Sequence, residues 1–311
     1  MKARGPILTR RRALAGGLVL AGLSLLEYES LSGKWDHTRI RPATAKERWD
    51  AALARLAAEP ALAAGALVHV GHSTHLLSVG GARFLTDPWF DDPAFGALSH
   101  TVGPAVRPEG VGPLGAILVT HDHADHADMN AIDRMDKRAA AIVATAGLAA
   151  KHRARGFSDV RVLAPWESTT VGGATVTAVP GLHDVYEIGF VVEGGGRRVY
   201  FAGDSKLFDG IREIAERLRP DVAILPVDGT RLRGQPLHVM RPEDAVVAAK
   251  TLGARHLVPS HAEAYFSDPL AGNVIATNVA SASEKFAALA RAALPAVAVS
   301  VPLPGELVPL P

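Results

Sequence analysis

Residues 116–126 read AILVTHDHADH, and this stretch decides the fold. Its first part, 116–120, is apolar and predicts a buried strand. Directly after it stand four side chains of the types that bind metals: His121, His123, Asp125 and His126. Imidazole and carboxylate together suit zinc, and also iron or manganese. So many polar groups at one strand end are unfavourable unless an ion holds them, so the stretch predicts a metal centre.

The spacing within this loop predicts two ions. In an extended loop, His121 and His123 point the same way and can bind one ion. The turn displaces Asp125 and His126, which can then reach a second ion roughly 3.5–4 Å from the first, as in centres for metal-assisted hydrolysis. The alternative, a solvated histidine-rich loop, is disfavoured because the pattern HxHxDH directly follows a strand.

The pattern HxHxDH resembles the signature of the metallo-β-lactamase superfamily. The resemblance implies a later histidine, an aspartate and a last histidine, each at the end of a strand, and the chain offers them in that order. It implies two ligand sets and one bridging residue: His121, His123 and His183 for one ion, Asp125, His126 and His261 for the other, and Asp204 between them.

Flanking motifs narrow this resemblance to one branch. Residues 70–74 read VGHST and residues 84–90 read FLTDPWF. Residues 165–173 read PWESTTVGG and residues 238–245 read HVMRPEDA. These motifs look like the branch that holds the N-acylphosphatidylethanolamine-hydrolysing phospholipase D and the ascorbate-6-phosphate lactonase-like proteins. The match runs from about residue 66 to 261.

Three residues outside the ligand set are expected near the ions. Asp87 ends a predicted strand, and we expect its carboxylate to hold a ligand histidine in the correct tautomer; an Asx turn before Pro88 is the alternative. The resemblance places His72 beside the metals in a supporting role. It also places His238 close to the ions, where it could bind a developing oxyanion or protonate a leaving group.

The resemblance therefore implies a metal-dependent hydrolase with two zinc ions per chain, or iron or manganese in their place. A hydroxide between the ions would cleave an ester-type bond, either a phosphodiester or a lactone or carboxylic ester, with Asp125 and His238 as catalytic residues. One alternative is a mononuclear iron oxygenase of the same fold, which needs only the first ligand set. Others are a phospholipase D-like lipid hydrolase specifically, and a non-catalytic binding protein.

Composition limits the partners. Hydrophobic residues make up 48% of the chain, enough for a large core. The net charge of +1 and the lack of a basic stripe argue against nucleic acid, so we expect a small-molecule or lipid-like substrate. The chain has no cysteine, which excludes disulfides and thiolate ligands. The sequence does not indicate an oligomeric state.

The first residues have a different character. Three arginines at 10–12 precede an apolar run from Ala13 to Leu26, which is typical of a twin-arginine export signal. The run is shorter than the roughly 20 residues of a membrane span, although an uncleaved anchor remains an alternative. We therefore expect residues 1–30 to be an export signal or membrane anchor and the protein to be periplasmic, or membrane-anchored facing the periplasm.

Residues 31–65 are expected to connect this segment to a hydrolase domain at 66–311. Two β-rich halves, each with helices, predict an α/β protein with a four-layer αββα sandwich. Within it we expect helices at 43–58, 207–218 and 242–252 and a closing strand at 296–301. The histidines at positions 37, 100 and 152 are expected at the surface.

Overall fold

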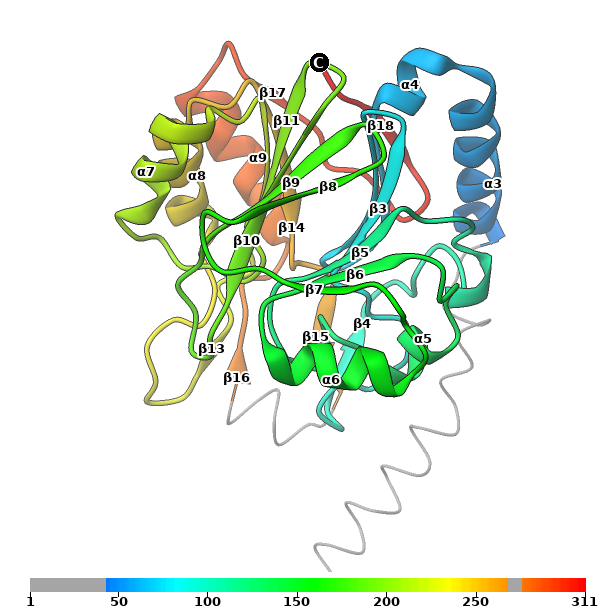
Figure 1. The fold of residues 1–311 in the computed structure, drawn as a ribbon. Coiled ribbons are helices and arrows are strands. Elements are labelled where there is room, and N and C mark those ends of the chain that lie inside the picture. The colour runs from blue at the N-terminus through cyan, green and yellow to red at the C-terminus, as the bar shows by residue number, and fades with distance from the viewer. Residues whose placement is uncertain (1–42, 268–275) are drawn as a thin grey trace, which may run out of the picture. The chain divides into compact units, whose positions relative to one another are not determined.

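The computed structural model describes residues 43–267 and 276–311. Two seven-stranded sheets face each other, and helices cover their outer faces (Figure 1). The first sheet has the order β18-β1-β2-β3-β5-β6-β7 and the second has the order β17-β14-β12-β11-β10-β9-β8. The structure therefore confirms the predicted four-layer αββα sandwich.

The first sheet combines antiparallel and parallel pairs. β1, β2 and β3 are antiparallel, whereas β3, β5, β6 and β7 run parallel to their neighbours. Its strands are β1 (Gly65–Gly71), β2 (Thr74–Val79), β3 (Ala82–Thr86), β5 (Ala116–Val119), β6 (Ala140–Val143), β7 (Val160–Val162) and β18 (Leu307–Pro309). Because β3 and β5 are parallel neighbours, the residues that follow them meet at one edge of the sheet.

The second sheet also combines antiparallel and parallel pairs. β8, β9, β10 and β11 are antiparallel, and β11, β12, β14 and β17 are parallel. Its strands are β8 (Ser168–Val171), β9 (Ala174–Pro180), β10 (Ile188–Gly194), β11 (Arg197–Phe201), β12 (Val222–Pro226), β14 (His256–Ser260) and β17 (Ala298–Val299). Two short pairs lie outside the sheets: β4 (Leu98–His100) with β15 (Ala264–Phe266), and β13 (Arg231–Leu232) with β16 (Ala276–Thr277).

The core follows the two-residue period of the strands. Along β10, Phe190 and Val192 pack between the two sheets, while Val191 faces the outer helices. β11 alternates in the same way, with Tyr200 on the helix side. Since both faces of these strands are covered, their sequences are almost continuously apolar. Burial of this kind contributes about 25 cal/mol for each Å² of apolar surface and holds the strand ends in place.

Helices complete the sandwich. The hydrophobic cluster of the first sheet includes side chains of α3, and the outer cluster of the second sheet includes side chains of α8 and α9. The helices are α3 (Ala43–Ala58), α4 (Pro60–Ala64), α5 (Met129–Asp133), α6 (Ala146–Ala154), α7 (Gly210–Leu218), α8 (Pro242–Leu252) and α9 (Ala282–Ala293), with a 3₁₀ turn at Pro108–Gly110. Pro242 at the first position and Gly253 in the left-handed region after the last residue delimit α8.

The N-terminal boundary of the domain differs from the prediction. Trp49, Leu56 and Leu62 lie in α3 and α4, within the segment expected to be a connector, yet they are buried in the core with β1. The compact unit therefore includes this part of the chain instead of beginning at residue 66. The predicted export signal at 1–30 lies outside the described residues. None of the helices in the described ranges is long and apolar enough to cross a membrane.

Some other local predictions were wrong. The closing strand expected at 296–301 is reduced to β17, and β18, which pairs with β1 at the edge of the first sheet, was not expected. The helix expected at 207–218 begins at Gly210. His100 and His152, expected at the surface, are fully buried: His100 stacks on Trp89, and the Nδ1 of His152 bonds the Leu148 carbonyl.

Candidate metal centre

The predicted ligands and the two expected supporting residues, His72 and Asp87, lie at strand ends that converge between the two sheets. The first sheet supplies residues after β1, β3 and β5, and the second supplies residues after β9, β11 and β14. In chain order these residues are His72, Asp87, the loop 121–126, His183, Asp204 and His261. The fold thus gathers at one place side chains that are far apart in the sequence.

One cluster, the first ligand group, consists of His121, His123, His183 and Asp204. Each offers one ligand atom, and these atoms all lie within 4.8 Å of one another. The Nε2 of His183 lies 3.2 Å from the Nδ1 of His123. His123 is only partly buried, so this group reaches the surface there, whereas the side chain of His183 is 2% exposed.

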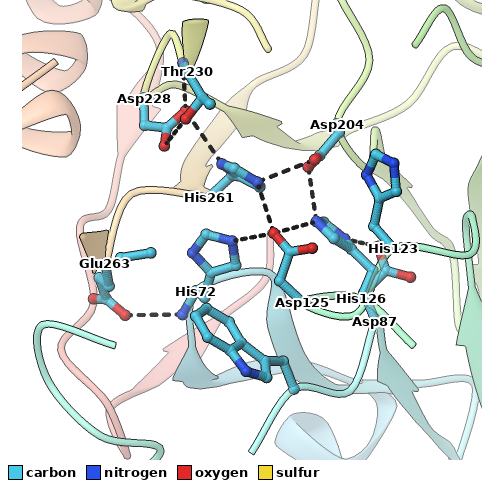
Figure 2. Close-up of polar contacts among 12 residues, drawn as sticks. His72, Asp87, His123, Asp125, His126, Asp204, Asp228, Thr230, His261 and Glu263 are labelled. Atoms are coloured by element: carbon cyan, nitrogen blue, oxygen red, sulfur yellow. Dashed lines mark hydrogen bonds and ion pairs between the residues drawn. The ribbon is translucent and has the colours of Figure 1, made fainter. Parts of the chain in front are cut away.

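A second cluster, the second ligand group, consists of His72, Asp125, His126 and His261, and all four are buried. The Oδ2 of Asp125 lies 3.7 Å from the Nε2 of His126 and 3.7 Å from the Nε2 of His261. Figure 2 shows the three imidazoles arranged around this carboxylate. The sequence had assigned three of these residues to one ion and had given His72 only a supporting role.

Asp204 lies between the two groups. Its Oδ1 is 3.1 Å from the Nε2 of His126, and its Oδ2 is 3.0 Å from the Nε2 of His261 (Figure 2). Its Oδ2 is also 4.0 Å from the Nε2 atoms of His121 and His183. One carboxylate therefore faces ligand nitrogens of both groups, which is the position that the resemblance required for a bridging residue.

The second ring nitrogen of two ligand histidines faces a carboxylate. The Nδ1 of His126 lies 2.8 Å from Asp87 Oδ2, the contact that the predicted role of Asp87 requires. Asp87 also accepts hydrogen bonds from the amide and hydroxyl of Thr120, which fix its own position. The Nδ1 of His261 lies 3.2 Å from Asp228 Oδ1. Such partners hold the ring so that Nε2 is free to bind an ion.

His121 is supported by Glu187, a fully buried residue that the sequence did not indicate. The Nδ1 of His121 lies 2.9 Å from Thr120 Oγ1 and 3.3 Å from Glu187 Oε1. The same Oε1 accepts the amide of Asp204 at 2.6 Å. Gly203 makes this contact possible, because a Cβ there would lie 2.5 Å from Oε1 and its φ is +63°.

His238 lies beside the first ligand group but is not one of the clustered ligands. Its main-chain carbonyl accepts a hydrogen bond from His183 Nδ1 at 3.0 Å, which orients that ring. Its own ring contacts the carboxylate of Asp184, which also pairs with Lys206. The structure therefore brings His238 to the edge of the site, where its Nε2 has no hydrogen-bond partner among the described residues.

Three of the residues that build the centre are held in the left-handed backbone region. The φ angles are +54° at His72, +30° at Asp87 and +53° at His261. Side chains with a Cβ rarely adopt this conformation, and it persists only where the surroundings impose it. The amide of His261 donates to the carbonyl of His72 at 3.3 Å, so two of the strained turns support each other.

The electrostatics of the centre favour a cation. Burial, and then the neighbouring His261, lower the pKa of His72 to about 4. Burial, and then His126, lower the pKa of His121 to about 3. Burial works against ionisation of Asp204, but the facing imidazoles His126 and His261 outweigh it and hold the pKa well below its usual range. At His126 and His261 burial lowers the pKa, but the facing carboxylates, Asp204 first, outweigh it and raise the pKa well above its usual range, so an ion would replace these protons. Neutral imidazoles and ionised carboxylates are the forms that bind metal.

The buried polar atoms provide an independent test of fit. The Nε2 atoms of His72, His121, His126 and His261 are buried without a hydrogen bond to any described residue, as are one oxygen of Asp125 and one of Asp204. Unpaired buried polar groups are rare, because each one is costly. These atoms converge with metal-ligand spacing, so the donor set fits one or two cations of the zinc, iron or manganese type.

Comparison with known proteins agrees with this geometry. Residues 82–262 match the family described as the Beta-lactamase superfamily domain. The chain belongs to this superfamily. A UPF0173 metal-dependent hydrolase from Rubrobacter xylanophilus is 34% identical over 212 residues, which cover 63% of this chain and 80% of that protein. The chain is therefore a metal-dependent hydrolase with the metallo-β-lactamase fold.

Solved structures support the same fold. A possible metal-dependent hydrolase from Veillonella parvula has a TM-score of 0.67 at 20% identity, over 79% of this chain and 99% of that chain. A diiron β-hydroxylase from Streptomyces venezuelae has a TM-score of 0.59 at 20% identity, over 79% of this chain and 54% of that chain. At these identities the likeness concerns the fold alone. The narrower resemblance to the phospholipase D and lactonase branch stays a prediction.

Sequence reasoning missed Glu187, Asp228 and Glu263. Asp228 follows β12 as Asp204 follows β11, so the position of a carboxylate after a strand was an available signal. Glu187 precedes β10 and Glu263 lies two residues beyond His261, and neither matches a ligand pattern. Glu187 is recognisable only because it is buried beside His121, and Glu263 only because its carboxylate accepts the amide of His72.

Proposed function

We propose that the protein is a two-zinc hydrolase that cleaves an ester-type bond, either a phosphodiester or a lactone or carboxylic ester. The observation that carries the proposal is the position of Asp204, whose carboxylate faces both ligand groups within one buried cluster. Two ligand groups joined by a carboxylate suit two ions a few ångströms apart. An iron or manganese pair is the closest alternative, because the same donors accept those ions.

His121, His123 and His183 would hold one ion and Asp125, His126 and His261 the other, with Asp204 shared. When bound, such ions supply an acidified water and polarise the oxygen of the substrate. The chain's own residues supply orientation. Asp87 and Glu187 fix ligand rings, and the Oδ1 of Asp125 has no hydrogen-bond partner among the described residues. This unpaired oxygen supports a role for Asp125 in orienting an attacking water as well as in binding an ion.

His238 is the proposed proton donor. It lies beside the partly exposed first ligand group, and its ring contacts the carboxylate of Asp184. A protonated His238 can give its proton to the leaving oxygen as the ester bond breaks. Lys206, which pairs with the same Asp184, helps to hold that carboxylate in place.

The surroundings of the first ligand group support a substrate with an apolar part. Phe95 is 61% exposed although it packs edge-on against His123. Leu182, Val185 and Tyr186 flank His183 and are also exposed. Exposed apolar side chains beside a polar centre are typical of ligand-binding sites. A lipid-like or otherwise apolar ester fits this edge better than a nucleic acid, which would require a basic surface.

A mononuclear iron oxygenase would need only the first ligand group. A complete and fully buried second ligand group argues against that alternative, since buried polar residues without a partner are costly. A non-catalytic binding protein is disfavoured for the same reason. We also propose that residues 1–30 direct the protein to the periplasm, with or without a retained membrane anchor.

The proposal is tested by elemental analysis of the purified full chain, together with turnover of a phosphodiester, a lactone and a β-lactam. We expect about two zinc ions per chain and cleavage of the phosphodiester or the lactone. Asp122→Asn is a matched control, because Asp122 lies in the same loop but pairs with Lys151 at 2.6 Å and belongs to neither group. A single iron ion with no hydrolysis of any substrate would contradict the proposal.

A further inference from the structure

His72 has the contacts of a metal ligand. Its Nε2 lies 3.8 Å from Asp125 Oδ2, almost the same distance as the 3.7 Å that separates this oxygen from His126 and from His261. A separation of 3.8 Å is too long for a hydrogen bond. Two ligands that share one zinc ion, each about 2.0–2.1 Å away, lie roughly 3–4 Å apart when the ion has four or five ligands. The distance from His72 Nε2 to Asp125 Oδ2 therefore matches the distances of the two expected ligands, His126 and His261, to the same oxygen.

The ring nitrogens of His72 have no other binding partner among the described residues. It is 1% exposed, and neither of its nitrogens bonds a residue in the described ranges. Trp89 packs edge-on against it at 4.9 Å between ring centroids, and His261 lies 4.1 Å away on the same measure. A buried imidazole without a hydrogen bond is unfavourable unless something else binds its nitrogen.

Hydrogen bonds of the backbone fix the position of the His72 ring. The amide of His72 donates to the Glu263 carboxylate at 3.0 Å, and its carbonyl accepts the amide of His261. Glu263 is in turn held by His69, whose Nε2 lies 2.7 Å from the same oxygen. Figure 2 shows the bond between His72 and Glu263. These bonds hold the turn in its strained conformation, in which His72 has a φ of +54°. His69, His72 and Glu263 line a hollow of about 10 Å³, which is close to the size of one water.

We propose that His72 is a ligand of the ion held by Asp125, His126 and His261, and that Glu263 is the positioning residue that aims it. The inference rests on the proposed two-ion function. With Asp204, this ion is surrounded by five protein side chains, whereas the first ligand group has four and reaches the surface. A closed set of ligands is typical of a structural site, and an open one is typical of a catalytic site. Substrate then binds on the side of the first ligand group.

The direct test measures the distance in the wild-type full chain loaded with zinc chloride. A crystal structure with anomalous data at the zinc edge should place His72 Nε2 about 2.0–2.1 Å from one ion. A separation above about 3 Å, beyond the range of zinc–nitrogen bonds, would overturn the proposal.

A second test uses variants and measures zinc binding by competition with a chromophoric chelator. His72→Asn tolerates the positive φ but is too short to reach the ion. We expect one of the two zinc ions to bind at least about 100-fold more weakly, because loss of an outer partner alone weakens binding 10–100-fold. His152→Asn, a matched loss of a buried imidazole whose Nδ1 bonds the Leu148 carbonyl outside both groups, should bind both ions as the wild type does.

The outcomes separate this inference from the proposed function. If the wild type binds two zinc ions and His72→Asn binds both unchanged, the inference fails and the two-ion function stands. If the wild type binds fewer than two ions, the proposed function fails and the inference fails with it. Glu263→Gln, which keeps the shape of the side chain, should weaken the same single ion less than His72→Asn does.

Discussion

The two ligand groups differ in burial, although they share Asp204. His123 of the first ligand group is partly exposed and packs against exposed Phe95, and exposed Tyr186 follows His183 in the chain. Every member of the second ligand group is buried and packed against the turns that follow β1 and β14. One centre therefore contains two environments: the first ligand group is accessible to a substrate, and the second is suited to retain its ion.

The largest expected effect comes from removing the shared residue. Asp204→Ala leaves both groups without the carboxylate that faces them, so we expect loss of both ions and at least a thousand-fold loss of activity, about 4 kcal/mol. Metal content and turnover are measured together. If this variant kept full activity, the two groups would not act as one centre.

Removing a ligand from the accessible side should separate the groups. In His123→Ala we expect activity to fall about as far as in Asp204→Ala, while the ion of the buried group remains. Elemental analysis should therefore give about one ion per chain. Loss of both ions here would mean that the second ligand group does not retain its ion independently.

A smaller effect is expected at the accessible edge without any change in metal content. His238→Gln removes the proposed proton donor, so hydrolysis of an ester with a poor leaving group should fall about 100-fold. A nitrophenyl ester, whose leaving group needs no proton, should be hydrolysed almost as fast as by the wild type. An equal loss for both substrates would indicate that His238 positions His183 instead of donating a proton.

The smallest effect is expected from an outer partner of the buried group. Asp87→Asn weakens the support of His126 Nδ1, and we expect the zinc affinity of the second ligand group to fall 10–100-fold, with the first little changed. Zinc competition measurements on both sites give the comparison. If the affinity of the first ligand group fell instead, the contact between Asp87 and His126 would not have the role assigned to it.

Most of the fold and the main ligands were predictable because their signals are local. A strand followed by HxHxDH is a continuous pattern, and His183, Asp204 and His261 each follow a strand. Parallel strands bring their carboxyl ends to one edge, so side chains at those positions must approach one another. The wrong predictions concerned elements with a weak local signal or a role set by tertiary contacts. β18 and β17 are too short to carry a periodic signal, and α3 was assigned to a connector because its docking on β1 is a tertiary contact.

The sequence by itself determined the type of centre, since the donor residues and their order specify a metal site on an αββα scaffold. Only the tertiary structure showed that His72 lies in the same cluster as the predicted ligands. His72 and His261 are remote in the chain, and only the approach of the turn after β1 to the turn after β14 places both rings against Asp125. No spacing rule connects residues at the ends of strands in different sheets. Their meeting depends on how the two sheets pack, which is set by the whole core.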